Sequence, residues 1–256
     1  MNRLTDLLGT LRWFGLVLGV ASAAAAAAAE VSIAVASNFS SPMQAIARAF
    51  EQDTGHKAVM AFGSTGSFYA QVLSGAPFQV LLAADATTPA QLEKAALAVQ
   101  DSRFTYATGR LALWSRQAVM VDDPRAVLRN GAFRKLAIAN PKLSPYGAAA
   151  FETLTSLGLM GQVQDRLVEG QNIAQTHQFV STGNAELGFV ALSQVYANGR
   201  IAEGSGWLVP ANLHRPITQE AVLLNAGRDK PAAAALMAYL KGARARGIMR
   251  AFGYES

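Results

Sequence analysis

Two short polar segments stand out because all of their side chains are neutral. Ser37 and Asn38 lie in V-A-S-N-F-S-S-P, and Ser64 and Thr65 lie in F-G-S-T-G-S-F. Short hydroxyl and amide side chains donate hydrogen bonds without a formal charge. Each such bond to a charged oxygen contributes roughly 1.5 to 3 kcal/mol, so the pair predicts a site for a fully ionised oxyanion. Ordinary helix caps and loops use the same residues, and on pattern alone the two explanations weigh equally.

Both polar segments follow predicted strands and precede predicted helices. Strands are expected over residues 31–36 and 58–62, and Met43, Ile46 and Phe50 between them share one helix face. In open α/β sheets, ligands bind at the carboxyl ends of strands beside helix N-termini. A helix N-terminus attracts anions through its free N–H groups and partial positive charge. We therefore expect the two segments to form the floor of one site.

Cap residues predict where two of the helices begin and end. Ser41 is expected as the N-cap of the first helix and Pro42 as its first residue, with Gly55 ending it. A later helix is predicted to open at Gly147 and to bury Phe151 on its apolar face.

Strand and helix signals continue to alternate along the chain, which is typical of α/β folds with a largely parallel sheet. Further strands are predicted over residues 80–84, 111–114, 136–139, 187–191 and 221–224. With 256 residues, of which 51% are hydrophobic, the chain is long enough for one large domain or two lobes.

Composition narrows the function classes. Charged residues make up 15% of the chain, and the net charge of +5 includes no long run of like charges, which argues against a nucleic-acid-binding face. The chain has no cysteine, so disulfides, thiolate metal ligands and a cysteine nucleophile are excluded. Its three histidines lack the spacing of a helical metal site, and no metal is expected.

Residues 1–29 have the features of a secretory signal peptide. Arg3 and Arg12 give a positive start, and an apolar stretch followed by an alanine run completes the pattern. Cleavage is predicted after Ala29, which makes Glu30 the first mature residue. A retained membrane anchor is disfavoured because the strongly apolar part is shorter than the roughly 18 to 20 residues that span a bilayer.

Catalysis and DNA binding are the rival function classes. A nucleophile elbow needs serine at the centre of its motif, whereas G-S-T-G-S has Thr65 there. His177 with Glu169 nearby could be a base with its orienting group, but a lone histidine beside apolar residues is interpreted as structural. A regulator with the same ligand-binding fold would need a helix-turn-helix, for which the chain has no room.

From Val31 onward the chain resembles the periplasmic molybdate-binding proteins of ABC uptake systems. The resemblance is carried by V-A-S-N-F at 35–39, G-S-T-G-S at 63–67, S-G-A-P-F-Q-V-L-L-A-A-D at 74–85, R-F-T-Y-A-T-G-R-L-A-L-W-S at 103–115 and A-E-L-G-F-V-A-L at 185–192. It implies the type II periplasmic-binding-protein fold, an α/β fold with two lobes, each a mixed sheet flanked by helices, and a ligand cleft between them. Hinge closure around the ligand is expected.

The resemblance also implies how the chain is divided. After the signal peptide, lobe one would hold residues 30–109 plus 211–256 and lobe two residues 110–210. The hinge would lie near Gly109 and Pro210.

The oxyanion contacts implied for lobe one fall on the two neutral segments. They are Ser37 and Asn38 in the first, and Thr65 in the second with Ser64 adjacent.

For lobe two, the resemblance points to the Tyr146 hydroxyl and the backbone N–H of Ile173. Many family members have a ligand tyrosine just after G-F-V, where this chain has Ala191, and Tyr146 in the P-Y-G sequence is expected to replace it. Lys142 in the same loop could reach the anion, but it is interpreted as a solvated side chain.

The implied function is capture of molybdate or tungstate in the interlobe cleft and delivery to the membrane permease of an ABC transporter. We expect a periplasmic monomer with no cofactor and no catalytic residue. The main alternative is sulfate or another tetrahedral oxyanion, and a hydrolytic enzyme ranks below it. Phosphate is disfavoured because it is partly protonated at neutral pH and calls for a carboxylate acceptor, which the two segments lack.

Overall fold

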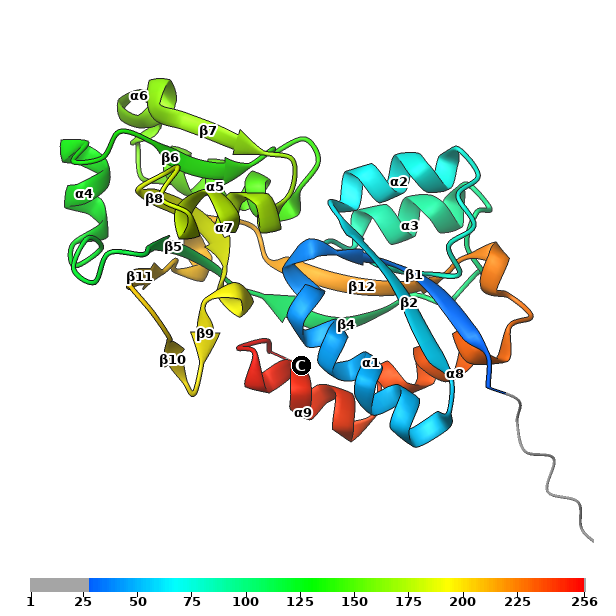
Figure 1. Cartoon of the computed structure of the whole chain (residues 1–256). Helices are drawn as coiled ribbons and strands as arrows, with labels where there is room; N and C mark the ends of the chain where they lie inside the picture. Colours follow the sequence, from blue (N-terminus) through cyan, green and yellow to red (C-terminus); the bar gives the residue numbers. More distant parts are fainter. Residues whose placement is uncertain (1–27, 256) are drawn as a thin grey trace, which may run out of the picture.

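The computed structural model describes residues 28–255, so the predicted signal peptide of residues 1–29 falls almost entirely outside the described residues. The described chain forms two five-stranded sheets (Figure 1). The first has the order β2 (Lys57–Gly63), β1 (Glu30–Ala36), β3 (Val80–Leu82), β12 (Ile217–Leu223) and β4 (Phe104–Gly109). The second has the order β11 (Ser205–Leu208), β5 (Leu111–Ser115), β8 (Leu187–Ala191), β6 (Leu136–Ala139) and β7 (Leu167–Gly170).

Helices flank both sheets. Around the first sheet lie α1 (Ser40–Thr54), α2 (Thr65–Leu73), α3 (Thr87–Lys94), α8 (Pro231–Leu240) and α9 (Ala243–Ala251), and around the second lie α4 (Pro124–Asn130), α5 (Pro145–Ser156), α6 (Met160–Val163) and α7 (Ile173–Ser181). Short 3-10 turns are η1 (Ser37–Phe39), η2 (Gln164–Arg166), η3 (Leu192–Gln194), η4 (Ala211–Leu213) and η5 (Asn225–Gly227), and a small hairpin pairs β9 (Tyr196–Ala197) with β10 (Arg200–Ile201). Within residues 28–255 no helix is long and apolar enough to cross a membrane.

Both sheets are mixed. In the first, β1 pairs in parallel with β2 and β3, whereas β12 runs antiparallel to β3 and β4. In the second, β6 pairs in parallel with β7 and β8, whereas β5 runs antiparallel to β8 and β11. Two lobes, each with a mixed sheet between helices, confirm the predicted fold class.

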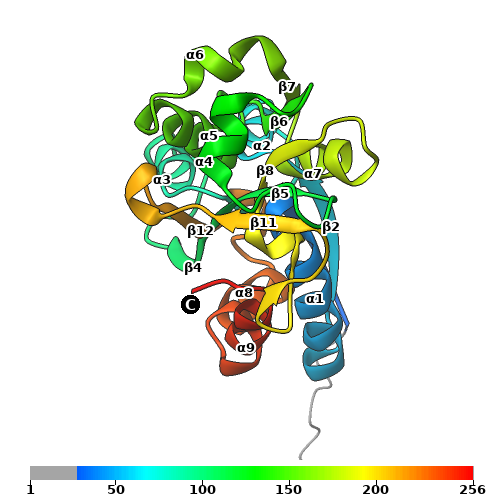
Figure 2. The same ribbon diagram turned by 90° about the vertical axis from the view of Figure 1, so that its left-hand side faces the viewer.

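Alternation along β1 explains how the first sheet is sandwiched. Ile33 and Val35 pack with α1, α8 and α9 on one face, whereas Ala34 packs with Phe68 of α2 and Leu92 of α3 on the other. Figure 1 shows the same two layers, with α2 and α3 above the sheet and α1, α8 and α9 below it. The second sheet packs likewise, with α5 on one face and α7 on the other (Figure 2).

The chain passes between the two sheets twice. The first passage, from β4 to β5, leaves Arg110 alone between the strands, and the second runs from the end of β11 through η4 to β12. The two sheets are therefore joined by short segments that lie beside the interface between the lobes.

The strands that sequence reasoning missed lie at sheet edges. β4, β7 and β11 are edge strands, and none was expected. β7 has three of its four residues exposed or half-buried, so it lacks the continuous apolar run of an inner strand. β12 also starts at Ile217, earlier than the predicted Ala221.

Two predicted helix boundaries are wrong. The first helix begins at Ser40, because η1 runs directly into it through a bond from Ser40 Oγ to the Ser37 carbonyl at 2.7 Å. The helix expected to open at Gly147 begins at Pro145. That start points Tyr146 into the interior, and Phe151, predicted to be buried, is 46% exposed.

Candidate oxyanion site between the lobes

Strand register brings the two neutral segments together. In the parallel pair of β1 and β2, Ala36 is the partner of Gly63, so Ser37 and Ser64 leave the sheet at the same level. β3 pairs with β1 up to Leu82, which places its carboxyl end at the same edge. Backbone pairing therefore brings the two neutral segments to one edge of the first sheet.

Thr65 and Ser64 have different surroundings. Ser64 is the N-cap of α2, and its Oγ accepts from the Ser67 backbone N–H at 3.3 Å and lies 2.6 Å from Ser67 Oγ. Thr65 Oγ accepts from the backbone N–H of Ala84 at 3.0 Å. Because that bond uses the oxygen as acceptor, the Thr65 hydroxyl hydrogen is free to be donated elsewhere. Thr65 is therefore the better candidate donor to an anion, whereas the contacts of Ser64 are those of a helix cap.

Asn38 uses its side chain within the protein. Its Nδ2 donates to Gln219 Oε1 and to the Tyr254 hydroxyl, both at 2.9 Å. An amide nitrogen carries two hydrogens, so both are used. The backbone N–H of Asn38 lies in the first turn of η1, where N–H groups have no partner within the helix. The backbone N–H is therefore the donor that Asn38 can direct to an anion.

In the second sheet, Ile173 opens a helix at the carboxyl end of a strand. It is the first residue of α7, and the Asn172 side chain caps the N–H groups of Ala174 and Gln175 at 3.0 and 3.1 Å. The N–H of Ile173 is not among the capped donors, so it remains available for an anion. Gln194 Nε2 donates to the Ile173 carbonyl at 3.1 Å and holds this helix start in place.

Tyr146 is the second residue of α5, which follows β6, and it is 1% exposed. Its hydroxyl accepts from Gln219 Nε2 at 3.1 Å. Burial, followed by the neighbouring phenols of Tyr254 and Tyr106, raises the pKa of Tyr146 well above its ordinary value. The hydroxyl therefore keeps its hydrogen and can act as a donor.

The structure brings the predicted site residues to one buried interface. All six are 5% exposed or less: Ser37, Asn38, Ser64, Thr65, Tyr146 and Ile173. Gln219 joins Asn38 to Tyr146, and η1 packs against α7. Gly66 at the start of α2 donates its backbone N–H to the Leu143 carbonyl of the other lobe at 2.9 Å. Their roles as ligands stay predictions.

Sequence reasoning missed a buried polar network behind these residues. Gln219 Oε1 also accepts from the Tyr106 hydroxyl at 2.9 Å. The Asn38 carbonyl accepts from Ser193 Oγ at 2.8 Å and from the Tyr254 hydroxyl at 3.0 Å. A polar residue on the inward face of a strand was the available signal for Gln219, but the strand prediction began after it. Like the two neutral segments, this network contains no charged side chain.

Gly109, the last residue of β4, lies against the Tyr146 hydroxyl. A Cβ at this position would stand 2.1 Å from that oxygen and 2.5 Å from Gln219 Nε2. Only glycine leaves room for both side chains at this passage between the sheets.

The structure also gives the surroundings of Ala191, Lys142 and His177. Ala191 is fully buried at the end of β8, and its backbone N–H donates to Gln194 Oε1 at 3.0 Å. Lys142 is exposed, in agreement with a solvated side chain. His177 stacks on Trp114 with ring centroids 5.1 Å apart, and burial lowers the pKa of its imidazole. This packing fits the structural role predicted for His177.

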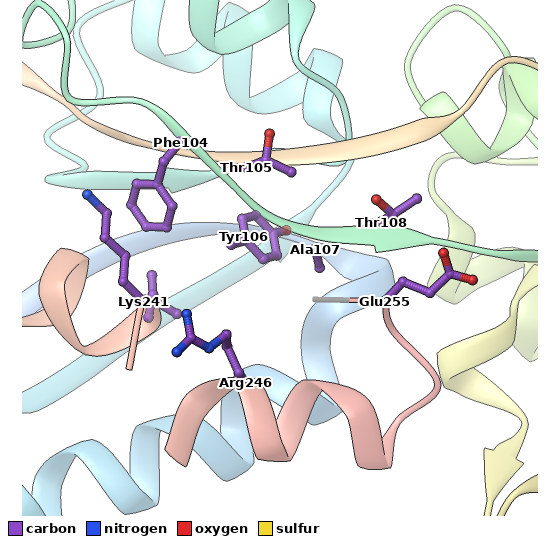
Figure 3. Close-up of a pocket in the computed structure, with 9 residues that line it drawn as sticks. Phe104, Thr105, Tyr106, Ala107, Thr108, Lys241, Arg246 and Glu255 are labelled. Carbon is purple, nitrogen blue, oxygen red and sulfur yellow. The ribbon is translucent and has the colours of Figure 1, made fainter. Parts of the chain in front are cut away.

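Two hollows lie near this region. A groove of about 400 Å³ between the lobes is bordered by Gly66, Ala84, Lys142 and Pro216, and none of the six predicted site residues lines it directly. A second hollow of about 420 Å³ lies on the outer edge of the first sheet, where Lys241 and Arg246 reach toward β4 (Figure 3). Only elements of the first lobe line this second hollow, and none of the six predicted site residues is among its lining residues. Among residues 28–255 no cluster of three or more His, Asp or Glu side chains could hold a metal ion.

The described chain matches known proteins over almost its whole length. The family model for bacterial extracellular solute-binding proteins matches residues 31–255. The chain belongs to this family. The solute-binding protein is 59% identical over 254 residues to the molybdate-binding protein ModA of Azotobacter vinelandii, covering 99% of this chain and 97% of the relative. It is 46% identical over 239 residues to ModA of Rhodobacter capsulatus, covering 93% and 92% of the two chains.

Solved structures agree with the sequence comparison. The solute-binding protein superimposes on the periplasmic molybdate-binding protein of Azotobacter vinelandii with a TM-score of 0.85 and 40% identity. The match covers 88% of this chain and 99% of the other. The predicted family and fold are thus confirmed.

Proposed function

We propose that this protein captures molybdate, or the nearly isosteric tungstate, in the cleft between its lobes and delivers it to the membrane permease of an ABC transporter. The observation that carries the proposal is a buried junction of neutral donors and helix starts from both lobes. Relatives named as molybdate-binding proteins, at up to 59% identity, support molybdate as the cargo.

Five donors bind the anion in this proposal, three from lobe one and two from lobe two. The Ser37 and Thr65 hydroxyls bind from lobe one, together with the Asn38 backbone N–H, while Ser64 caps α2 beside them. Bonds to an anion from such donors are stronger than neutral ones because the acceptor is charged.

Lobe two adds the Tyr146 hydroxyl and the Ile173 backbone N–H. We place lobe one at residues 30–109 plus 211–256 and lobe two at 110–210, joined where the chain passes between the sheets. Closure of the lobes would complete the donor set around the oxyanion.

The donor set also bears on which oxyanion is bound. A dianion presents acceptors in every direction, whereas a protonated oxyanion presents an O–H group to a site made of donors. We therefore expect a fully ionised tetrahedral oxyanion and no catalytic step. Sulfate is also a dianion, so cargo identity is a matter for measurement.

Location and assembly complete the proposal. The protein acts in the periplasm as a monomer after signal-peptide cleavage near Ala29, a position directly before β1. Mass spectrometry of the secreted protein would give its first residue, and light scattering would give its oligomeric state.

Calorimetric titration of the ligand-free mature protein with molybdate, tungstate, sulfate and phosphate tests the function. We expect tight one-to-one binding of molybdate and tungstate, with little heat from the other two. Tight binding of sulfate without binding of molybdate would identify sulfate as the cargo. Absence of binding with all four oxyanions would overturn the proposal.

A further inference from the structure

Gln219 of β12 is an uncharged side chain that connects both halves of the proposed site. It is fully buried, and all of its hydrogen-bonding partners are polar groups of the protein interior. Its Oε1 accepts from Asn38 Nδ2 and the Tyr106 hydroxyl, both at 2.9 Å, and its Nε2 donates to the Tyr146 hydroxyl at 3.1 Å. An unsatisfied buried amide costs roughly 1 to 3 kcal/mol, so these partners fix its orientation.

The direction of each hydrogen bond follows from the neighbours. Tyr254 directs its hydroxyl hydrogen to the Asn38 carbonyl or to Ser193 Oγ, both at 3.0 Å, so its oxygen receives the Asn38 amide. The same Asn38 amide nitrogen then faces Gln219 and requires an acceptor there. Rotating the Gln219 amide by half a turn would set two donors against each other.

The orientation of Gln219 in turn determines what Tyr146 does. Because Nε2 has hydrogens and no free lone pair, it must donate to the Tyr146 oxygen. The single hydrogen of the tyrosine is then left for an acceptor other than Gln219, either the bound anion or the hydroxyl oxygen of Tyr254 beside it. A tyrosine that binds an anion must direct its hydroxyl hydrogen to that anion, so its hydrogen must not be used by Gln219.

We propose that Gln219 is a positioning residue of the oxyanion site, which by donating to the Tyr146 hydroxyl turns the hydrogen of that hydroxyl toward the bound anion. This inference rests on the proposed function and goes beyond it, because Gln219 itself does not touch the anion. It acts on the one proposed donor that is a long side chain.

A double-mutant cycle measured by calorimetry with molybdate tests the coupling. The variants are Gln219→Met, which keeps the length of the side chain without its hydrogen bonds, Tyr146→Phe, and the double variant. We expect Gln219→Met to weaken binding roughly tenfold when Tyr146 is present and less than twofold when it is replaced. Tyr106→Phe is the matched control, because it removes another bond to Gln219 and leaves the Nε2 bond to Tyr146 in place; it should show less than a threefold loss.

Three results would overturn the inference. Equal losses of molybdate affinity from Gln219→Met in the wild-type protein and in the Tyr146→Phe variant would overturn the inference, because the effect of Gln219 would then not depend on Tyr146. Normal affinity in Tyr146→Phe would also overturn it while leaving the proposed function intact. If the wild-type protein binds none of the oxyanions, the function and this inference fall together.

Gln219→Glu provides a readout that a purely structural role would not move. A neutral carboxyl can donate to Tyr146 through its O–H, whereas an ionised one only accepts and would draw the tyrosine hydrogen away from the anion. The titratable groups facing this position are Tyr106, Tyr146 and Tyr254, whose phenol pKa values burial raises above their ordinary value, and Asp85 beyond Tyr106. The introduced carboxyl is therefore the group expected to titrate between about pH 6 and 9, since burial raises carboxyl pKa values.

Molybdate affinity of Gln219→Glu should accordingly fall roughly tenfold between about pH 6 and 9, while wild type and Gln219→Met change less than threefold. Parallel pH profiles for all three proteins would contradict the proposed polarity. Thermal unfolding of each ligand-free variant checks that it is folded. If Gln219→Glu does not fold, the double-mutant cycle decides the matter alone.

Discussion

The two halves of the proposed site are built in different ways. In lobe one, short residues follow directly on paired strands, and the register of Ala36 with Gly63 alone sets their spacing. In lobe two, a long side chain, Tyr146, has to be brought into place by Gln219 and by the absence of a side chain at Gly109. The positions of Ser37 and Ser64 follow from strand register, whereas the position of Tyr146 depends on contacts that come from the other lobe.

The largest expected effect comes from Gly109→Ala, which would break the second half without removing a donor. The new Cβ would stand 2.1 Å from the Tyr146 hydroxyl and would displace it. Crowding and the lost bond together should weaken molybdate binding roughly 100-fold in calorimetry. Gly161→Ala is the control, since nothing lies within 4 Å of its Cβ. Wild-type affinity for Gly109→Ala would show that the Tyr146 hydroxyl need not occupy its present position.

Tyr146→Phe should weaken molybdate binding roughly 10- to 100-fold, because it removes one hydrogen bond to a charged oxygen. Ala191→Ser should change affinity less than threefold, because the present residue contributes no side-chain donor. If the Ala191 variant lost more affinity than the Tyr146 variant, the assignment of Tyr146 would be wrong.

Ser37→Ala and Thr65→Ala test the first half. Each should cost one charged hydrogen bond and lower affinity roughly 10- to 100-fold, independently of Gln219. Combining either with Gln219→Met should therefore give additive losses in free energy. Unchanged affinity in both single variants would remove these hydroxyls from the site.

The smallest effect on binding is expected for Ser64→Ala. Because Ser64 caps α2, the variant should lose roughly 1 kcal/mol of unfolding free energy but less than threefold in affinity. Thermal unfolding and calorimetry of the same sample separate the two quantities. A loss of affinity as large as that of Thr65→Ala would make Ser64 a ligand as well as a cap.

The sequence predicts the elements around the first half of the proposed site more fully than the contacts of the second. Apolar runs gave β1 and β2 to within one residue of their observed bounds, and Gly55 ends α1 as expected, with a φ of 74°. The neutral turns after β1 and β2 follow from short-range signals, namely strand ends and cap residues. Local rules therefore suffice where the donors come directly after a strand.

The remainder depends on contacts between residues far apart in the chain. Gln219 lies 181 residues from Asn38 and 73 from Tyr146, and no local pattern predicts that their side chains meet. Nor could the sequence show that both amide hydrogens of Asn38 are used inside the protein, which changes its expected contribution from side chain to backbone. The edge strands β4, β7 and β11 were missed because exposure weakens their apolar pattern.

The bond between the Gly66 N–H and the Leu143 carbonyl has a consequence for how such proteins diverge. Both partners are main-chain atoms, and a Cβ on Gly66 would stand only 3.0 Å from Leu143 Cα. Substitutions at position 143 leave this link between the lobes intact, provided that the loop keeps its path. This one contact between the lobes is thus independent of the side chain at position 143, so the loop can change in sequence while the contact persists.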